Sequence, residues 1–160
     1  MRPIGVHVCR QPRRPSEQQH SRCSSERKAH LDGLGDEVIP EGWSEARMGD
    51  CLSIEHGRNQ GQVVDPTGRF PILGSGGEIG RTDAFLHEGP SVLIGRKGTI
   101  DRPQYMDSPF WTVDTLFYSR IRDGYSPKFL YYKFLMVDWR SFNEASGVPS
   151  LNASTIEGVK

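Results

Sequence analysis

Two cations stand between two glycines directly after an apolar segment, in the run VLIGRKG at residues 92–98. The apolar half is typical of a buried strand, and such a strand rarely ends in adjacent cations unless they have something to hold. Arg96 can grip a phosphate, or the O6 and N7 atoms of guanine, with two hydrogen bonds. Lys97 supplies a point charge. The spacing therefore leaves four partners open: a phosphate, a base edge, an acidic neighbour, or water.

A second glycine-rich turn lies at residues 74–77, Gly-Ser-Gly-Gly. Glycine lets the backbone come close to a ligand and can expose N–H groups as anion contacts. Arg81 and Arg102 lie near the two turns in sequence, with Tyr105 beyond them. Two interpretations remain equally open on these residues alone. The turns bind an anionic partner, or they are tight turns with solvated cations.

The motifs that would indicate catalysis are incomplete. Residues 74–80 fail the dinucleotide pattern GxGxxG, because Ile79 stands where the last glycine is needed and no helical pattern follows. Residues 95–99 lack the G-K-[ST] order of a phosphate-binding P-loop. A nucleophile elbow around Ser75 would need glycine at Leu73. The sequence predicts no catalytic residue.

Histidines and cysteines are scattered near the amino terminus, at positions 7, 9, 20, 23 and 30. No pair has the C-x₂-C or H-x₃-H spacing of a zinc site, so we predict no metal site. Three cysteines at irregular spacing do not form a disulfide framework, which favours a reducing, cytoplasmic setting. We identify no secretory signal and no apolar run long enough to span a membrane.

The charge balance argues against a strongly basic nucleic-acid-binding domain. The chain of 160 residues has a formal net charge of zero. Residues 1–39 carry seven basic and five acidic side chains, and residues 40–160 carry 13 basic and 15 acidic ones. Any anion binding must come from local clustering of cations.

The elements that would position the turns can be predicted from pattern. Residues 1–37 show no periodicity and are expected to be poorly ordered, whereas apolar clusters recur from about residue 38. Short strands are predicted at 70–73 and 91–95, and a long one at 110–121. Ser126 and Pro127 begin a helix expected to run to about Phe142. Strands without alternating helices predict an α+β fold with a mixed, mostly antiparallel sheet.

Three smaller predictions complete this outline. Residues 48–54 are expected to form a short helix or strand, and a second helix is expected to start at Asn152 or Ser154. Trp43 is either a core anchor or a lid. The aromatic residues assigned to the core are Trp111, Phe117, Phe129, Phe134 and Trp139.

Several segments together resemble one known family. The opening PEGW at 40–43 followed by MGD at 48–50 resembles the start of a target recognition domain from the specificity subunit of type I restriction–modification systems. The central stretch GRFPILGSGGEIGRTDAFLHEGPSVLIGRKGTI, then SPFWTVDTLFY, FLYYKFL and SGVPSLNASTIEGV, follow in the family's order. The resemblance covers residues 38–160.

The resemblance implies a non-catalytic domain that reads one half of a split double-stranded DNA target. It implies modification subunits as partners and, through them, restriction subunits. S-adenosylmethionine, ATP and Mg²⁺ would be bound only by those partners. By position, Arg96 and Lys97 are expected to contact phosphate. The full set of expected DNA-binding residues is Ser75, Gly76, Arg81, Arg96, Lys97, Gly98, Thr99 and Arg102.

The sequence departs from the family pattern in two respects. A full subunit has two recognition domains and two spacer helices, whereas this chain has one domain, and we expect the spacer helix to be absent or truncated. Residues 1–37 match nothing in the family. A second half-subunit is therefore an expected partner. Two alternatives remain open: a recognition fragment of a fused methyltransferase–endonuclease, and a protein-interaction remnant without function of its own.

Overall fold

The computed structural model describes Val6–Cys9 and residues 43–160. The strands form three sheets, of two strands (β1-β2), four strands (β3-β9-β6-β7) and three strands (β5-β4-β8). The elements are β1 (Val6–Cys9), β2 (Trp43–Ala46), α1 (Met48–Cys51), β3 (Leu52–His56), β4 (Phe70–Gly74), β5 (Gly77–Thr82), β6 (Ser91–Gly95), β7 (Gln104–Met106), β8 (Trp111–Thr112), β9 (Leu116–Ile121), α2 (Pro127–Met136), a 3₁₀ helix η1 (Trp139–Phe142) and α3 (Ala153–Gly158).

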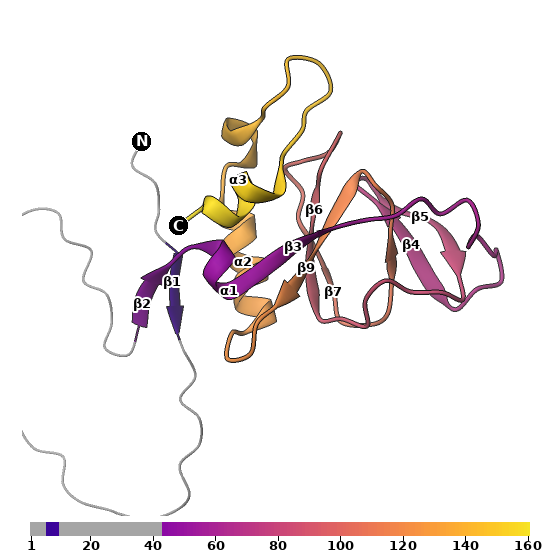
Figure 1. Cartoon of the computed structure of the whole chain (residues 1–160), viewed down its shortest axis with the longest axis horizontal. Helices are drawn as coiled ribbons and strands as arrows, with labels where there is room; N and C mark the ends of the chain where they lie inside the picture. Colours follow the sequence, from indigo (N-terminus) through magenta and orange to yellow (C-terminus); the bar gives the residue numbers. More distant parts are fainter. Residues whose placement is uncertain (1–5, 10–42) are drawn as a thin grey trace, which may run out of the picture.

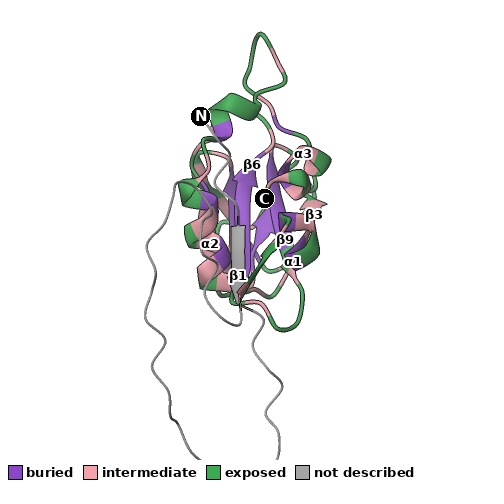
Figure 2. Cartoon of the chain, turned by 90° about the vertical axis from the view of Figure 1, so that its left-hand side faces the viewer, coloured by how far each residue is buried: buried purple, intermediate pink, exposed green. Residues whose placement is uncertain are grey.

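The four-stranded sheet is antiparallel throughout and is apolar on both faces. In β6, Val92 and Ile94 pack toward the helices, while Leu93 packs on the opposite face. A strand covered on both faces reads as a continuous apolar run, which explains the unbroken VLI before Gly95. Figure 2 shows β6 and β9 as buried strands in the middle of the molecule, with α2 on one side and α1 and α3 on the other.

The two longer helices begin where the sequence places capping residues. The Ser126 hydroxyl accepts a hydrogen bond from the Phe129 N–H, with Pro127 in the first helical position. The Asn152 side chain accepts one from the Thr155 N–H at 2.8 Å, which confirms the predicted start of α3. Figure 1 shows the three α-helices beside the four-stranded sheet, on the side away from β4 and β5.

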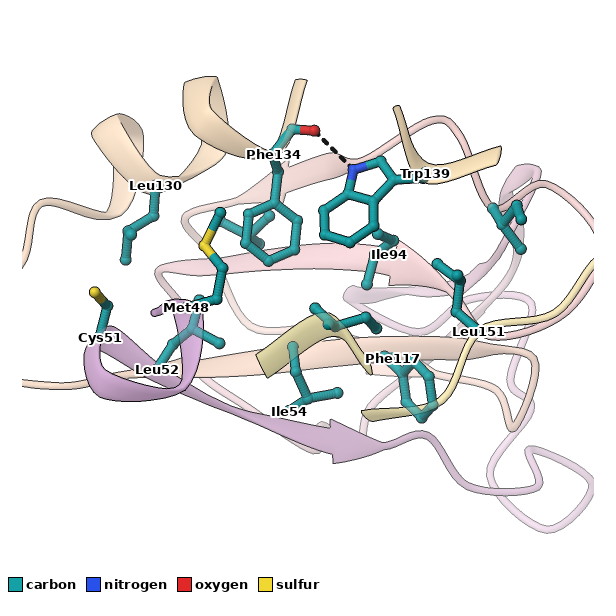
Figure 3. Packing of buried hydrophobic residues seen from close by; sticks show 13 residues of the cluster. Met48, Cys51, Leu52, Ile54, Ile94, Phe117, Leu130, Phe134, Trp139 and Leu151 are labelled. Atoms are coloured by element: carbon teal, nitrogen blue, oxygen red, sulfur yellow. Dashed lines mark hydrogen bonds between the residues drawn. The ribbon is translucent and has the colours of Figure 1, made fainter. Parts of the chain in front are cut away.

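The main core lies between the four-stranded sheet and the helices (Figure 3). Trp139 is 1% exposed and its indole N–H donates to the Phe134 carbonyl at 2.7 Å. Truncation of a tryptophan in such a site costs about 3–5 kcal/mol. The buried members are Met48, Cys51, Leu52, Ile54, Val92, Ile94, Ile100, Phe117, Leu130, Phe134, Trp139, Leu151 and Ile156.

The aromatic core prediction is largely confirmed. Trp111, Phe117 and Phe134 are buried, as is Trp139, whereas Phe129 is only half-buried. Trp43 is also half-buried, and its ring packs edge-on against Phe129 with the centroids 5.4 Å apart. It therefore packs against α2 beside the main core, through Phe129.

The prediction of one long strand at 110–121 is wrong. The segment divides into β8 and β9, which belong to different sheets. Between them Val113 donates its N–H to the Leu73 carbonyl, and Leu116 donates to the Val113 carbonyl in a turn. β8 runs parallel to β4, whereas β9 runs antiparallel to both β3 and β6.

The prediction that the helix continues to Phe142 is also wrong. Helix α2 ends at Met136, because Val137 adopts an extended conformation with φ −82° and ψ 132°. The Trp139 indole then folds back and satisfies a carbonyl in the last turn of the helix. A short 3₁₀ helix follows at Trp139–Phe142.

The α+β class with mixed, mostly antiparallel pairing is confirmed. The segment 48–54 contains both a helical turn, α1, and the start of β3. Strand β1 falls within the segment predicted to be poorly ordered, yet it pairs antiparallel with β2. The rest of residues 1–37 lies outside the described residues, so that prediction stays a prediction.

Candidate nucleic-acid interface

The loop Gly95–Gly98 follows β6 and is held by its backbone. The N–H groups of Arg96 and Lys97 both donate to the Thr115 carbonyl, at 2.9 and 3.2 Å. The Gly98 N–H donates to Pro149, and the Arg96 carbonyl accepts from Leu151. The expectation that this turn offers its N–H groups to an anion is therefore wrong, because the protein's own carbonyls already occupy them. Only the side chains remain for a ligand.

Two glycines give this loop its shape. A Cβ atom on Gly95 would lie 2.0 Å from the Thr99 carbonyl oxygen, a distance that no side chain can adopt. Gly98 has φ +86°, in the left-handed region that favours glycine. The chain thus reverses tightly after β6, with Arg96 half-exposed and Lys97 exposed.

The two glycine turns predicted from the sequence meet in the structure. A Cβ atom on Gly98 would lie 3.2 Å from the Ser75 hydroxyl oxygen. The Gln104 amide donates to the Gly74 carbonyl at 3.2 Å and holds the second turn against β7. Ser75 is half-exposed and Gly76 exposed. The structure therefore brings Ser75 and Gly76 next to the cationic loop, although about twenty residues separate them in sequence.

Thr99 and Arg102 extend the same region along the chain. Thr99 is half-buried directly after Gly98, and Arg102 is exposed three residues later. Beside Arg102, the Asp101 carboxylate pairs with Arg140 at 2.7 Å. Arg102 makes no ion pair within 4 Å with a described residue.

The contacts of Arg96 show whether the loop cations form ion pairs with carboxylates of the domain. Its guanidinium donates to the backbone carbonyl of Asp114 at 3.3 Å, and not to a carboxylate. Within residues 43–160 neither Arg96 nor Lys97 forms an ion pair. Pairing of Arg96 with the carboxylate of Asp114 or Glu88 would have made the loop purely structural, and that pairing is not formed.

Arg81 behaves differently from the other predicted residues. Its guanidinium donates to the carbonyls of Gly68 and Arg69, at 2.8 and 2.7 Å, and pairs with Glu78 at 3.1 Å. These contacts bind β5 to the loop that precedes β4, and they engage all three nitrogens of the side chain. Three of the five N–H groups of Arg81 therefore serve the hairpin.

A hollow of about 230 Å³ opens beside the cationic loop. Its lining includes His56 and Asn152, which the sequence pattern did not indicate as site residues. The His56 ring packs edge-on against Phe117, with the centroids 4.9 Å apart. The lining residues are His56, Arg96, Lys97, Phe117, Ser150, Leu151, Asn152 and Ala153. Polar groups thus surround an apolar base of Phe117 and Leu151.

Other chemistries have little support in the part of the chain that the structure describes. No group of three or more histidine, cysteine, aspartate or glutamate side chains there could hold a metal ion. Cys51 is buried, and burial together with the nearby Asp50 carboxylate raises the pKa of its thiol to about 11. That thiol is protonated at neutral pH and packs as a small apolar group. No described helix is long and apolar enough to cross a bilayer.

Residues 40–160 match the family model of the type I restriction modification DNA specificity domain. The chain belongs to this family. The predicted resemblance to the specificity subunit of type I restriction–modification systems is thereby confirmed. No curated protein matches the chain.

Solved structures of type I specificity subunits share the fold of this domain. The S subunit from M. genitalium superposes with a TM-score of 0.64 at 15% identity, over 79% of this chain and 34% of that one. The HsdS subunit from Thermoanaerobacter tengcongensis gives 0.57 at 16% identity, with the same two shares. A chain from a study of complex assembly and conformational transition of the type I R-M system gives 0.59 at 18%, over 76% and 34%. The specificity domain described here spans about a third of each chain.

Proposed function

We propose that this domain reads one half of a bipartite double-stranded DNA target, with the loop Gly95–Gly98 as its anchor on the sugar-phosphate backbone. The observation that carries the proposal is that the loop's backbone is bound within the protein while its cationic side chains are not. Its amides are bound to Thr115 and Pro149, while the side chains of Arg96 and Lys97 have no acidic partner within residues 43–160. In a domain without net positive charge, such free cations are the chemistry suited to an anionic polymer.

The roles of the individual residues follow from their positions. Phosphate contacts fix the register of a protein on DNA, and contacts to base edges supply specificity. We assign Arg96 and Lys97 to phosphate. Ser75, Thr99 and Arg102 surround the loop and carry hydroxyl or guanidinium donors suited to base edges. Gly76 and Gly98 let the backbone approach the duplex closely.

Arg81 takes a supporting role in this proposal instead of the DNA contact expected from the sequence. Its hydrogen bonds to Gly68 and Arg69 hold the β4–β5 hairpin, and that hairpin carries the turn with Ser75. Removal of Arg81 would therefore act on DNA binding mainly through the position of the turn.

The partners and chemistry of the complete system lie on other chains in this proposal. Modification subunits would bring S-adenosylmethionine, and restriction subunits ATP and Mg²⁺, in the cytoplasm. A second recognition domain would supply the other half of the target. Because one half-site supplies only part of the contacts, the domain alone should bind weakly.

A selection from a random duplex library at low salt tests the proposal, with and without a modification subunit. We expect one half-site sequence to be enriched, and more strongly when the modification subunit is present. The double variant R96A/K97A should lose binding to all sequences, while R81A, measured beside it, should keep the same preference. Binding without any sequence preference, or capture of the modification subunit without DNA, would contradict the proposal. Methyl transfer by this chain alone would instead favour the fused-enzyme alternative.

A further inference from the structure

His56 ends β3 at the rim of the hollow that Arg96 and Lys97 also line. Its Cα partner in the sheet is Phe117, and the two rings pack edge to face at 4.9 Å. The imidazole therefore rests on a buried ring while the residue as a whole stays exposed. Three side chains that can carry positive charge thus meet at one hollow from two segments about forty residues apart.

The acidic groups on the surrounding elements are engaged elsewhere. From α3, the Glu157 carboxylate accepts a hydrogen bond from the Ile54 N–H at 2.8 Å. Glu144 accepts from the side chains of Asn152 and Thr155. No acidic residue is among those that line the hollow.

Two further carboxylates in this region, Glu55 and Asp114, are also absent from the lining of the hollow. Glu55 alternates with His56 along β3 and lies 3.8 Å from Arg120. Asp114, which precedes β9, offers Arg96 only its backbone carbonyl among the hydrogen bonds of the described residues. A hollow with two permanent cations, one histidine and no acid in its lining favours an anion.

We propose that His56 completes a phosphate-binding site with Arg96 and Lys97, and that the positively charged form of its imidazole is the form that binds the DNA phosphate. This inference rests on the proposed function for its source of phosphate, a backbone phosphate of DNA. A protonated imidazole adds one positive charge and donates from both ring nitrogens. Ser150 and Asn152 supply neutral polar groups at the same hollow, and the apolar base suits the edge of the attached sugar.

The test measures the affinity of the full chain for a duplex of fixed sequence at about pH 6 and about pH 8, over a series of salt concentrations. At the lower pH the wild-type chain should bind roughly two- to tenfold more tightly. Its log–log salt slope should be steeper by up to about 0.9, as expected for one further phosphate contact. H56Q should show neither difference. H56K should bind tightly at both pH values, because its charge is permanent in this range.

H87Q is the matched histidine control. His87 lies on the other side of the sheet, against Phe110 and Tyr118, and burial together with nearby Arg120 lowers the pKa of its imidazole. This variant should keep the pH difference of the wild type. Thermal unfolding of each variant identifies any that fails to fold, and H56K then remains as the independent test.

The outcomes separate this inference from the proposed function. DNA binding that depends on Arg96 but keeps its full pH difference in H56Q would overturn the role of His56 and leave the proposed function standing. If the chain does not bind DNA, the phosphate site is tested with inorganic pyrophosphate. The NMR signals of the histidine rings are then recorded against pH, with and without pyrophosphate. A His56 titration midpoint that rises with pyrophosphate, while that of His87 does not, supports the site. No change in the His56 signal overturns it.

Discussion

In the loop Gly95–Gly98 the protein holds the backbone and leaves the cationic side chains outside. In the β4–β5 hairpin the reverse is true, because the side chain of Arg81 is held by three partners while the turn at Gly76 is open. The two regions carry the same residue types, glycine and arginine, in similar sequence settings. The comparison indicates that a cation near a glycine turn is a candidate ligand contact only when its donors are not already bound by carbonyls and carboxylates of the same domain.

The largest expected effect separates the two glycine turns. G95A should lower the free energy of unfolding by about 2–4 kcal/mol, because its Cβ would lie 2.0 Å from the Thr99 carbonyl oxygen. G76A should change it by less than about 0.5 kcal/mol, because no atom lies within 4 Å of the added Cβ. Urea unfolding followed by tryptophan fluorescence measures both variants. Equal stability of the two would refute the close chain reversal after β6.

An intermediate effect separates the two arginines. R81A should lower the free energy of unfolding by about 1–2 kcal/mol, because it removes hydrogen bonds to the carbonyls of Gly68 and Arg69. R96A should cost less than about 0.5 kcal/mol, since the only hydrogen bond from the Arg96 side chain to a described residue is the 3.3 Å contact with the Asp114 carbonyl. The same unfolding assay applies. A loss in R96A as large as that in R81A would make the cationic loop a structural one.

The smallest expected effect concerns Glu144, which supports the segment behind the loop. Hydrogen bonds from the Thr155 hydroxyl and the Asn152 amide hold the pKa of this carboxyl below its ordinary value. Because the folded pKa is lowered, the stabilisation is present above the unfolded pKa and is lost as the pH falls through the folded one. E144Q should therefore be slightly less stable than wild type at pH 7, and the gap should close in strong acid.

The control for this prediction is E88Q, at an exposed glutamate remote from Asn152 in the sequence. Thermal unfolding at a series of pH values should give the same curve for E88Q and wild type. A stability gap for E144Q that widens toward low pH would show that the lowered pKa has been assigned the wrong cause.

Local signals in the sequence were sufficient for several elements. Strand β6 was predictable because three consecutive apolar residues end at a glycine, and α3 because Asn152 is a strong cap for a helix of ordinary composition. The family and the α+β class followed from the order of short motifs spread over residues 38–160. Both glycine turns could also be predicted, because each follows directly on an apolar strand and one holds two cations between its glycines.

The wrong or missing predictions concern segments whose local structure depends on contacts with residues distant in the sequence. Residues 110–121 have strand-forming side chains throughout, so composition could not reveal that the chain leaves one sheet at Val113 and enters another at Leu116. The end of α2 depends on the Trp139 indole folding back to Phe134. His56 joins the site only through its pairing with β9.

The salt dependence of DNA binding measures whether the loop Gly95–Gly98 presents Arg96 and Lys97 to DNA phosphates. The slope of log affinity against log salt should become shallower by about 0.9 for each of R96A and K97A. It should stay at the wild-type value in R81A, whose guanidinium is already bound within the protein. Wild-type slopes in both loop variants, or a loss in R81A as large as theirs, would contradict the account.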